Sequence, residues 1–143
     1  MDLEAFYGQP QQSSPLPPAA ACARQYLQSI GRPPAEARVL VLGIGCGQSA
    51  CRPGAPCTIR SLRQAGALVD FYDPHITEYE CDGIRTRGLA RLTCAALRRY
   101  DMVIVERPCP GTDYGAVAAS ARWVLDAGGA LRGCGARHNI HPL

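Results

Sequence analysis

The sequence contains no lysine, and all 15 of its basic residues are arginine. Any mechanism that needs a lysine amine is therefore excluded. Aromatic residues make up only 6% of the chain, and no apolar run approaches the roughly 18 residues that a membrane helix requires. Residues 1–18, MDLEAFYGQPQQSSPLPP, lack the basic start and apolar stretch of a secretory signal. We therefore expect a soluble, cytoplasmic protein that does not bind membranes and begins with a flexible leader over residues 1–18.

The arginines give the chain a formal net charge of +3, but they do not form one basic stripe. Their spread along the chain is illustrated by Arg24, Arg38, Arg60, Arg85 and Arg122. A concentrated basic patch is the usual electrostatic sign of nucleic-acid binding. We therefore expect a mixed, solvated surface and no nucleic-acid partner.

Eight cysteines in a chain of 143 residues raise the question of a disulfide framework or a metal site. Disulfides are rare in the cytosol, and zinc sites pair cysteines at short spacings such as C-x2-C. The closest pair here, Cys46 and Cys51, is five positions apart, and the nearest approach to a ligand pair is Cys134 with His138. We predict no metal site and interpret the cysteines as small buried apolar residues.

The hydrophobic pattern alternates between helical spacing and short continuous apolar runs. Helices are predicted over 19–31, 56–66, 93–100 and 113–121, and strands over 38–43, 67–74, 101–106 and 122–129. In the first helix, one face carries Ala20, Ala23, Leu27 and Ile30, and Gly31 is the expected C-cap. The order predicts one α/β domain over 19–133, a doubly wound, Rossmann-like three-layer sandwich with a mostly parallel sheet, and a tail over 134–143.

Ligands of such sheets bind beyond the carboxyl ends of the strands. The first strand ends in a glycine turn, GIGCG, that is similar to a phosphate-binding turn. As a dinucleotide fingerprint it is incomplete, because Gln48 replaces the third glycine and the acidic Asp73 follows after about 30 positions instead of about 20. The glycine turn of methyltransferases that use S-adenosylmethionine carries an acidic residue two positions before its first glycine. Here that position is Val41, so the turn does not match this motif either. Alternatively, these glycines only let the strand turn tightly into a helix.

Several motifs in order resemble one known family. They are ARVLVLG, GALVDFYDPHI, LTCAALRRYDMVIVE and DYGAVAASARWVLDAGGA, and they span residues 37–130. Together they are similar to the C-terminal, UDP-binding domain of the UDP-glucose/GDP-mannose dehydrogenase family. The resemblance runs from about residue 19 to about residue 133. Its most specific parts are the YDP of residues 72–74 and the ending DYGAVAASARWVLDAGG.

The resemblance implies a nucleotide site at the strand ends, formed by Gly43, Gly45, Cys46, Gly47, Arg52, Asp73, Asp126 and Gly128. Two cationic residues of the family are missing from it. Gly47 replaces the lysine that binds the nucleotide sugar, and Gly128 replaces an arginine that reaches the UDP. The family's T-x-H after the third strand becomes residues 106–108, Glu-Arg-Pro. A charge-assisted hydrogen bond to phosphate contributes about 1.5 to 3 kcal/mol, so we expect weak binding of UDP.

In this family the NAD-binding domain and the catalytic cysteine lie upstream. The resemblance therefore implies no catalytic residue here and no cofactor bound by this chain alone, NAD belonging to the full-length enzymes. Backbone N–H groups at the glycine turn and at a helix N-terminus near Pro56 remain available to hold a diphosphate.

Three hypotheses remain open. The first is a non-catalytic subunit that binds UDP or a UDP-sugar weakly and forms a homodimer or associates with a dehydrogenase subunit. The second is an inactive dehydrogenase fragment with no ligand. The third is a small enzyme of another class, in which Cys46 or Cys109 is the nucleophile and His75 the base.

Overall fold

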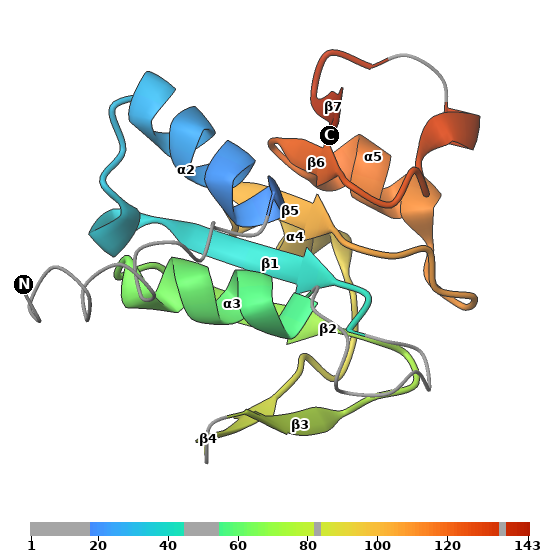
Figure 1. The fold of residues 1–143 in the computed structure, drawn as a ribbon. Coiled ribbons are helices and arrows are strands. Elements are labelled where there is room, and N and C mark those ends of the chain that lie inside the picture. Colours follow the sequence, from blue (N-terminus) through green and yellow to red (C-terminus); the bar gives the residue numbers. More distant parts are fainter. Residues whose placement is uncertain (1–17, 45–54, 82–83, 135–136) are drawn as a thin grey trace, which may run out of the picture.

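The computed structural model describes residues 18–44, 55–81, 84–134 and 137–143. The main sheet has five parallel strands in the spatial order β2-β1-β5-β6-β7 (Figure 1). Their bounds are Arg38–Leu42 for β1, Leu68–Tyr72 for β2, Met102–Val105 for β5, Val124–Asp126 for β6 and Ile140–Pro142 for β7. Counted along the chain, these strands follow the flavodoxin-like order 2-1-3-4-5. The predicted doubly wound α/β class is confirmed.

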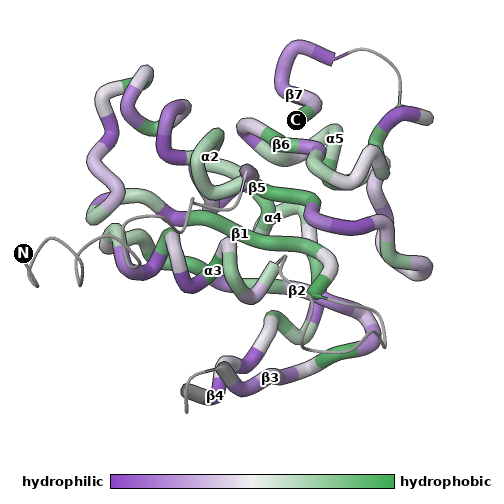
Figure 2. Tube along the Cα trace, viewed as in Figure 1, coloured by the Kyte–Doolittle hydropathy of each residue, from purple (hydrophilic) through white to green (hydrophobic). Residues whose placement is uncertain are grey.

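Helices cover both faces of this sheet. α2 (Pro18–Ser29) and α3 (Ala55–Gln64) lie on one face, and α4 (Cys94–Arg98) and α5 (Tyr114–Ser120) on the other. β1 is buried on both sides, because Val39 and Val41 pack toward α2 and α3 while Leu40 and Leu42 pack toward α4 and α5. Figure 2 shows β1 and β5 mostly in the hydrophobic colour, at the centre of the molecule. Within the described ranges, no helix has the length and apolar character needed to cross a bilayer.

Local signals in the sequence explain where the helices begin and end. Thr93 caps α4 as predicted, since its Oγ1 accepts a hydrogen bond from the Ala96 N–H at 3.0 Å. α2 ends before Gly31, which has a φ of +71° and is the expected C-cap. The assignment of Ile30 to the buried face of this helix is wrong. α2 ends at Ser29, so Ile30 lies in the turn that follows and is 48% exposed.

Two parts of the structure were not expected from the sequence. An antiparallel hairpin of β3 (Glu78–Cys81) and β4 (Ile84–Arg87) follows β2. Arg63 of α3 fixes it, donating from Nη1 to Thr86 Oγ1 at 2.9 Å and from Nη2 to the Val69 carbonyl at 2.8 Å. Residues 134–143 were expected to form a tail outside the domain. They instead include the last residue of η2 (Arg132–Cys134) and all of β7, which pairs with β6 in the main sheet.

A buried carboxylate organises the amino ends of the strands. Asp101, just before β5, accepts a hydrogen bond from the Arg38 N–H at 2.8 Å and another from Arg32 Nε at 3.0 Å. η1 (Pro34–Glu36) lies in the connection between α2 and β1 that this contact holds. Nearby, Tyr100 Oη donates to Asp70 at 2.7 Å. The pKa of Tyr100 is raised, mainly by burial and in addition by its hydrogen bond to the Asp70 carboxylate, so the phenol keeps its proton.

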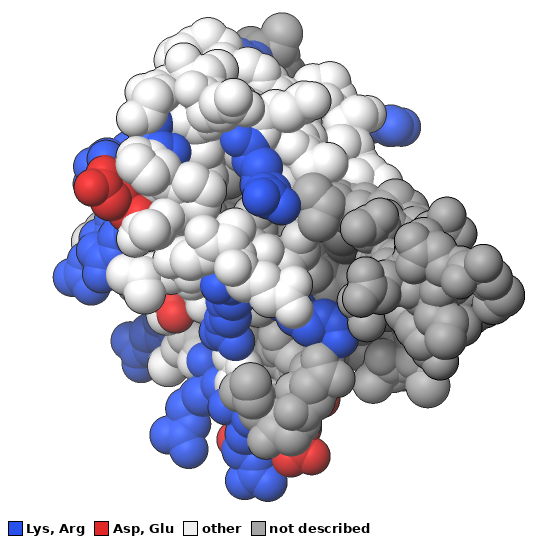
Figure 3. All heavy atoms as spheres, turned by 60° about the vertical axis from the view of Figure 1, so that its left-hand side comes forward, with Lys and Arg blue, Asp and Glu red and all other residues white. Residues whose placement is uncertain are grey.

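Arginine side chains lie at several separate places on the face shown in Figure 3, with acidic residues near some of them. Some arginines of the described residues form ion pairs. Arg32 pairs with Asp101 at 3.0 Å, and Arg85 with Glu78 at 4.0 Å. The expectation that no nucleic acid binds here stays a prediction.

Asn139 joins the last strand to the end of α5. Its side-chain Nδ2 donates to the carbonyls of Ala118 and Ala121, both at 3.0 Å, and its own carbonyl accepts from the Val124 N–H at 2.7 Å. The residue is only 8% exposed. Because α5 ends in carbonyls with no partner inside the helix, Asn139 supplies the hydrogen bonds that this end lacks.

We predict that Asn139→Asp lowers the free energy of unfolding by about 3 kcal/mol, because it places a carboxylate oxygen against two carbonyls. Urea denaturation at neutral pH measures this change. Gln28→Glu, the same amide-to-acid change on the exposed face of α2, is the control and should stay within about 0.5 kcal/mol of the parent. Equal, small effects of both variants would show that the Asn139 bonds do not hold β7 in place.

Candidate functional site

The carboxyl ends of the parallel strands meet at one edge of the sheet, here called the carboxyl edge. Of the predicted site residues, Gly43 follows β1, Asp73 follows β2, Asp126 ends β6 and Gly128 comes two positions later. The structure thus brings four of the eight predicted residues to one edge. The other four, Gly45, Cys46, Gly47 and Arg52, fall in a part of the chain that the structure does not describe. In this strand order the topological switch point lies between β1 and β5.

At this switch point, the segment of residues 106–108 after β5 packs directly against two glycines. Gly43 has a φ of +85°, and a Cβ added to it would stand 2.6 Å from the Arg107 carbonyl oxygen. A Cβ on Gly128 would stand 2.8 Å from the Glu106 carbonyl oxygen and 3.0 Å from the Arg107 Cα. The fold therefore requires glycine at both positions, whether or not a ligand binds there.

Asp73 and Asp126 use their carboxylates to hold loops of the chain itself. Asp73 is 4% exposed and accepts hydrogen bonds from the backbone N–H groups of Ile44 at 2.9 Å and His75 at 2.7 Å. It thereby ties the start of the loop after β1 to the end of β2. Asp126 is also buried and accepts from the N–H groups of the turn that follows β6, at 2.9 and 3.0 Å. That both residues are nucleotide ligands stays a prediction; in the structure their carboxylates hold the loops at this edge.

Glu106 places a further carboxylate at the switch point. Its side chain is half-buried and accepts a hydrogen bond from the hydroxyl of Thr58, which lies in the first turn of α3. Its backbone N–H donates to the Leu42 carbonyl at 3.0 Å, which holds it beside the end of β1. The N-terminal end of a helix carries the positive end of the helix dipole. Glu106 therefore places a negative charge at the helix end where an anionic ligand would otherwise be stabilised most by the dipole of α3.

The sequence showed Glu106 only as a departure from the T-x-H of the family. The available signal was its place directly after a buried strand, at the edge where ligands of such sheets bind. Its contact with Thr58 could not be read from the sequence, because the two residues are 48 positions apart.

The cysteine and histidine pairing of the third hypothesis is not supported by the geometry. Cys109 is buried and disulfide-bonded, so it is not a free thiol. The expectation that every cysteine is a reduced, buried apolar residue is therefore wrong, and Cys94 is moreover exposed. His75 Nε2 lies 3.1 Å from the Pro110 carbonyl. Cys46, the other proposed nucleophile, is outside the described ranges.

A hollow of about 460 Å³ lies between the end of β2 and the hairpin. Its lining consists of Tyr72, Asp73, Pro74, Thr77, Glu78, Arg87, Gly88, Leu89 and Ala90. Charges of both signs face it from the two hairpin strands, where Glu78 and Arg87 are direct cross-strand partners. Across the described ranges, no group of three or more His, Cys, Asp and Glu residues is arranged to hold a metal ion.

We predict that Gly128→Ala lowers the free energy of unfolding by about 1 to 3 kcal/mol, because the new methyl group meets backbone atoms that cannot easily move. Gly133→Ala is the matched control, since a Cβ there has no heavy atom within 4 Å, and it should change stability by no more than about 0.5 kcal/mol. Thermal and urea denaturation of both variants measure the difference. If Gly128→Ala is as stable as the control, the close approach of residues 106–108 is not a constraint on the fold.

Comparisons with known proteins bear on the fold. No protein-family model matches the chain, and no curated protein matches its sequence. A solved structure, that of a UDP-D-ManNAc dehydrogenase from Pyrococcus horikoshii, is similar with a TM-score of 0.61 and 17% sequence identity. The match covers 87% of this chain but only 29% of that protein's chain. The chain therefore spans less than a third of that dehydrogenase and has the fold of one part of it.

Proposed function

We propose that the chain is a UDP-binding-type domain that works as a non-catalytic nucleotide-binding or partner subunit, with weakened contacts to UDP. The observation that carries this proposal is the parallel sheet, whose likeness to a UDP-D-ManNAc dehydrogenase extends over 87% of the chain. The ordered motifs of residues 37–130 independently resemble the UDP-binding domain of nucleotide-sugar dehydrogenases. UDP or a UDP-sugar would lie across the carboxyl edge, at the switch point between β1 and β5.

The contacts left for a nucleotide are mainly backbone donors. The family's lysine and arginine correspond to Gly47 and Gly128, neither of which supplies a cation. An arginine at position 128 would also require residues 106–108 to move, because even a Cβ comes within 3.0 Å of their backbone. Two lost contacts of about 1.5 to 3 kcal/mol each weaken a micromolar site by two to four powers of ten. We expect a dissociation constant for UDP of about 1 mM.

The alternative function, a structural domain without a nucleotide, is favoured by one observation. The Glu106 carboxylate already lies against Thr58 in the first turn of α3, where a diphosphate would otherwise bind. A phosphate brought to the same place would be repelled by this like charge. Removing the charge of Glu106 therefore separates the two candidate functions.

We predict that Glu106→Gln tightens UDP binding about fivefold, because the amide oxygen still accepts from Thr58 while the negative charge is gone. Isothermal titration calorimetry of UDP with both proteins measures this ratio. Glu36→Gln, which removes an equal charge from an exposed residue at the opposite end of β1, should leave the affinity unchanged. If neither the parent nor Glu106→Gln binds UDP, the domain without a nucleotide is the correct function. Submicromolar binding by the parent would show that the contacts are not weakened.

We also predict that the chain alone does not form NADH from NAD and a UDP-sugar. The reason is that the ordered motifs of residues 37–130 resemble the UDP-binding domain of that family, and this resemblance implies that the NAD site and the catalytic cysteine lie in other parts of the full-length enzymes. Absorbance at the NADH band, followed with UDP-glucose and UDP-N-acetylmannosamine as substrates, tests this. Turnover that scales with the concentration of the purified chain would contradict the non-catalytic role.

A further inference from the structure

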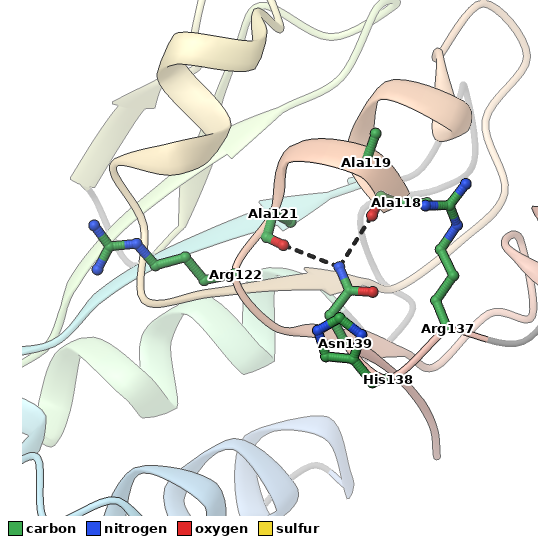
Figure 4. Close-up of a pocket in the computed structure, with 7 residues that line it drawn as sticks. All are labelled: Ala118, Ala119, Ala121, Arg122, Arg137, His138 and Asn139. Atoms are coloured by element: carbon green, nitrogen blue, oxygen red, sulfur yellow. Dashed lines mark hydrogen bonds between the residues drawn. The ribbon is translucent and has the colours of Figure 1, made fainter.

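A second hollow lies away from the carboxyl edge, beside the amino ends of β6 and β7. Its volume is about 470 Å³. It is lined by Ala118, Ala119, Ala121, Arg122, Arg137, His138 and Asn139 (Figure 4). These residues come from the end of α5, from the short connection between α5 and β6, and from the turn that precedes β7.

Hydrogen bonds within the protein fix the turn that carries Arg137 and His138. The Ile140 N–H donates to the Arg137 carbonyl at 3.2 Å, and Asn139 is bonded to α5 and to Val124. The side chains of Arg137 and His138 therefore start from a fixed backbone, which lowers the cost of ordering them around a ligand.

The same hydrogen bonds change the electrostatics of the hollow. The C-terminal end of a helix normally presents unpaired carbonyl oxygens, which repel anions. Here Asn139 Nδ2 covers two of them, those of Ala118 and Ala121, as the dashed lines in Figure 4 show. The end of α5 is thereby made less negative where it borders the hollow.

No acidic side chain of the described residues lines the hollow, whereas two arginines and a histidine do. Arg122 and Arg137 lie on opposite sides of Asn139 in Figure 4. Arg122 Nη1 is 3.9 Å from Asp101, so its charge is partly balanced. Arg137 is exposed and forms no ion pair or side-chain hydrogen bond with any residue of the described ranges.

The geometry points to a binding site for the phosphate group of a small phosphorylated molecule, with Arg137 as its main ligand. The planar guanidinium offers paired donors that match two phosphate oxygens. The three alanines are small and leave room beside the phosphate for the body of the molecule. A volume near 470 Å³ lies within the usual range of pockets for small ligands, about 300 to 1,000 Å³.

The test titrates the ¹⁵N-labelled chain with inorganic phosphate and with glucose 1-phosphate, replacing chloride so that ionic strength stays constant. Backbone amide shifts should change at residues 118–122 and 137–139, and they should saturate. Glucose 1-phosphate should bind more tightly than inorganic phosphate, because the hollow also contacts its sugar. Equal affinities would overturn the assignment to a phosphorylated molecule, and shifts spread evenly over all arginines would overturn the site itself.

Single arginine variants decide which group binds the phosphate. Arg137→Ala should raise the dissociation constant at least about fivefold. Arg122→Ala should have a smaller effect, because Asp101 already balances its charge. The control is Arg24→Ala, which removes an equal charge from an exposed position on α2. If Arg137→Ala and Arg24→Ala weaken binding equally, the effect is one of overall charge and the proposed site does not exist.

Discussion

The close approach of residues 106–108 to Gly43 and Gly128 is the contact on which the carboxyl edge depends. Neither glycine can carry a Cβ without meeting this segment at less than 3.0 Å. Backbone packing thus adds to the hydrogen bonds of the sheet, such as that from the Glu106 N–H to the Leu42 carbonyl, in fixing the ends of β1, β5 and β6 relative to one another. This constraint also gives a reason for Gly128, where the family that the sequence resembles is expected to carry an arginine: the chain uses that space for its own backbone.

Three carboxylates at this edge act on the protein itself. Asp73 and Asp126 accept hydrogen bonds from loop N–H groups, and Glu106 accepts from Thr58 at the beginning of α3. In these bonds, N–H and hydroxyl groups of the chain take the place of water or a ligand as partners of the carboxylates. The three carboxylates also make the edge more negative than a diphosphate site should be. The sheet is similar in fold to part of a UDP-D-ManNAc dehydrogenase, while Glu106 places a negative charge where the proposed nucleotide would need a positive one. The proposed weak binding and the alternative structural role both rest on that charge.

The sequence predicts the parts of this structure whose signals are local. Continuous apolar runs predict β1, β5 and β6, because strands buried on both faces need apolar residues at every position. β2 was also predicted, although it lies at the edge of the sheet and exposes Leu68 and Asp70. The hairpin of residues 78–87 was missed because Glu, Arg and Thr interrupt it, so no apolar face is visible. β7 was missed because it is three residues long and includes a proline. The roles of Asp73 and Glu106 depend on partners far away in the chain, and spacing does not reveal those.

The most direct test of this account is a map of UDP binding by amide shifts on the ¹⁵N-labelled chain. A weakened nucleotide site predicts saturable shifts, with a dissociation constant of about 1 mM, at Gly43, Asp73, Glu106 and Gly128. Those shifts should persist in Arg137→Ala, which removes the proposed phosphate ligand at the other edge. Saturable shifts confined to residues 118–122 and 137–139, or none at any position, would contradict a nucleotide site at the carboxyl edge.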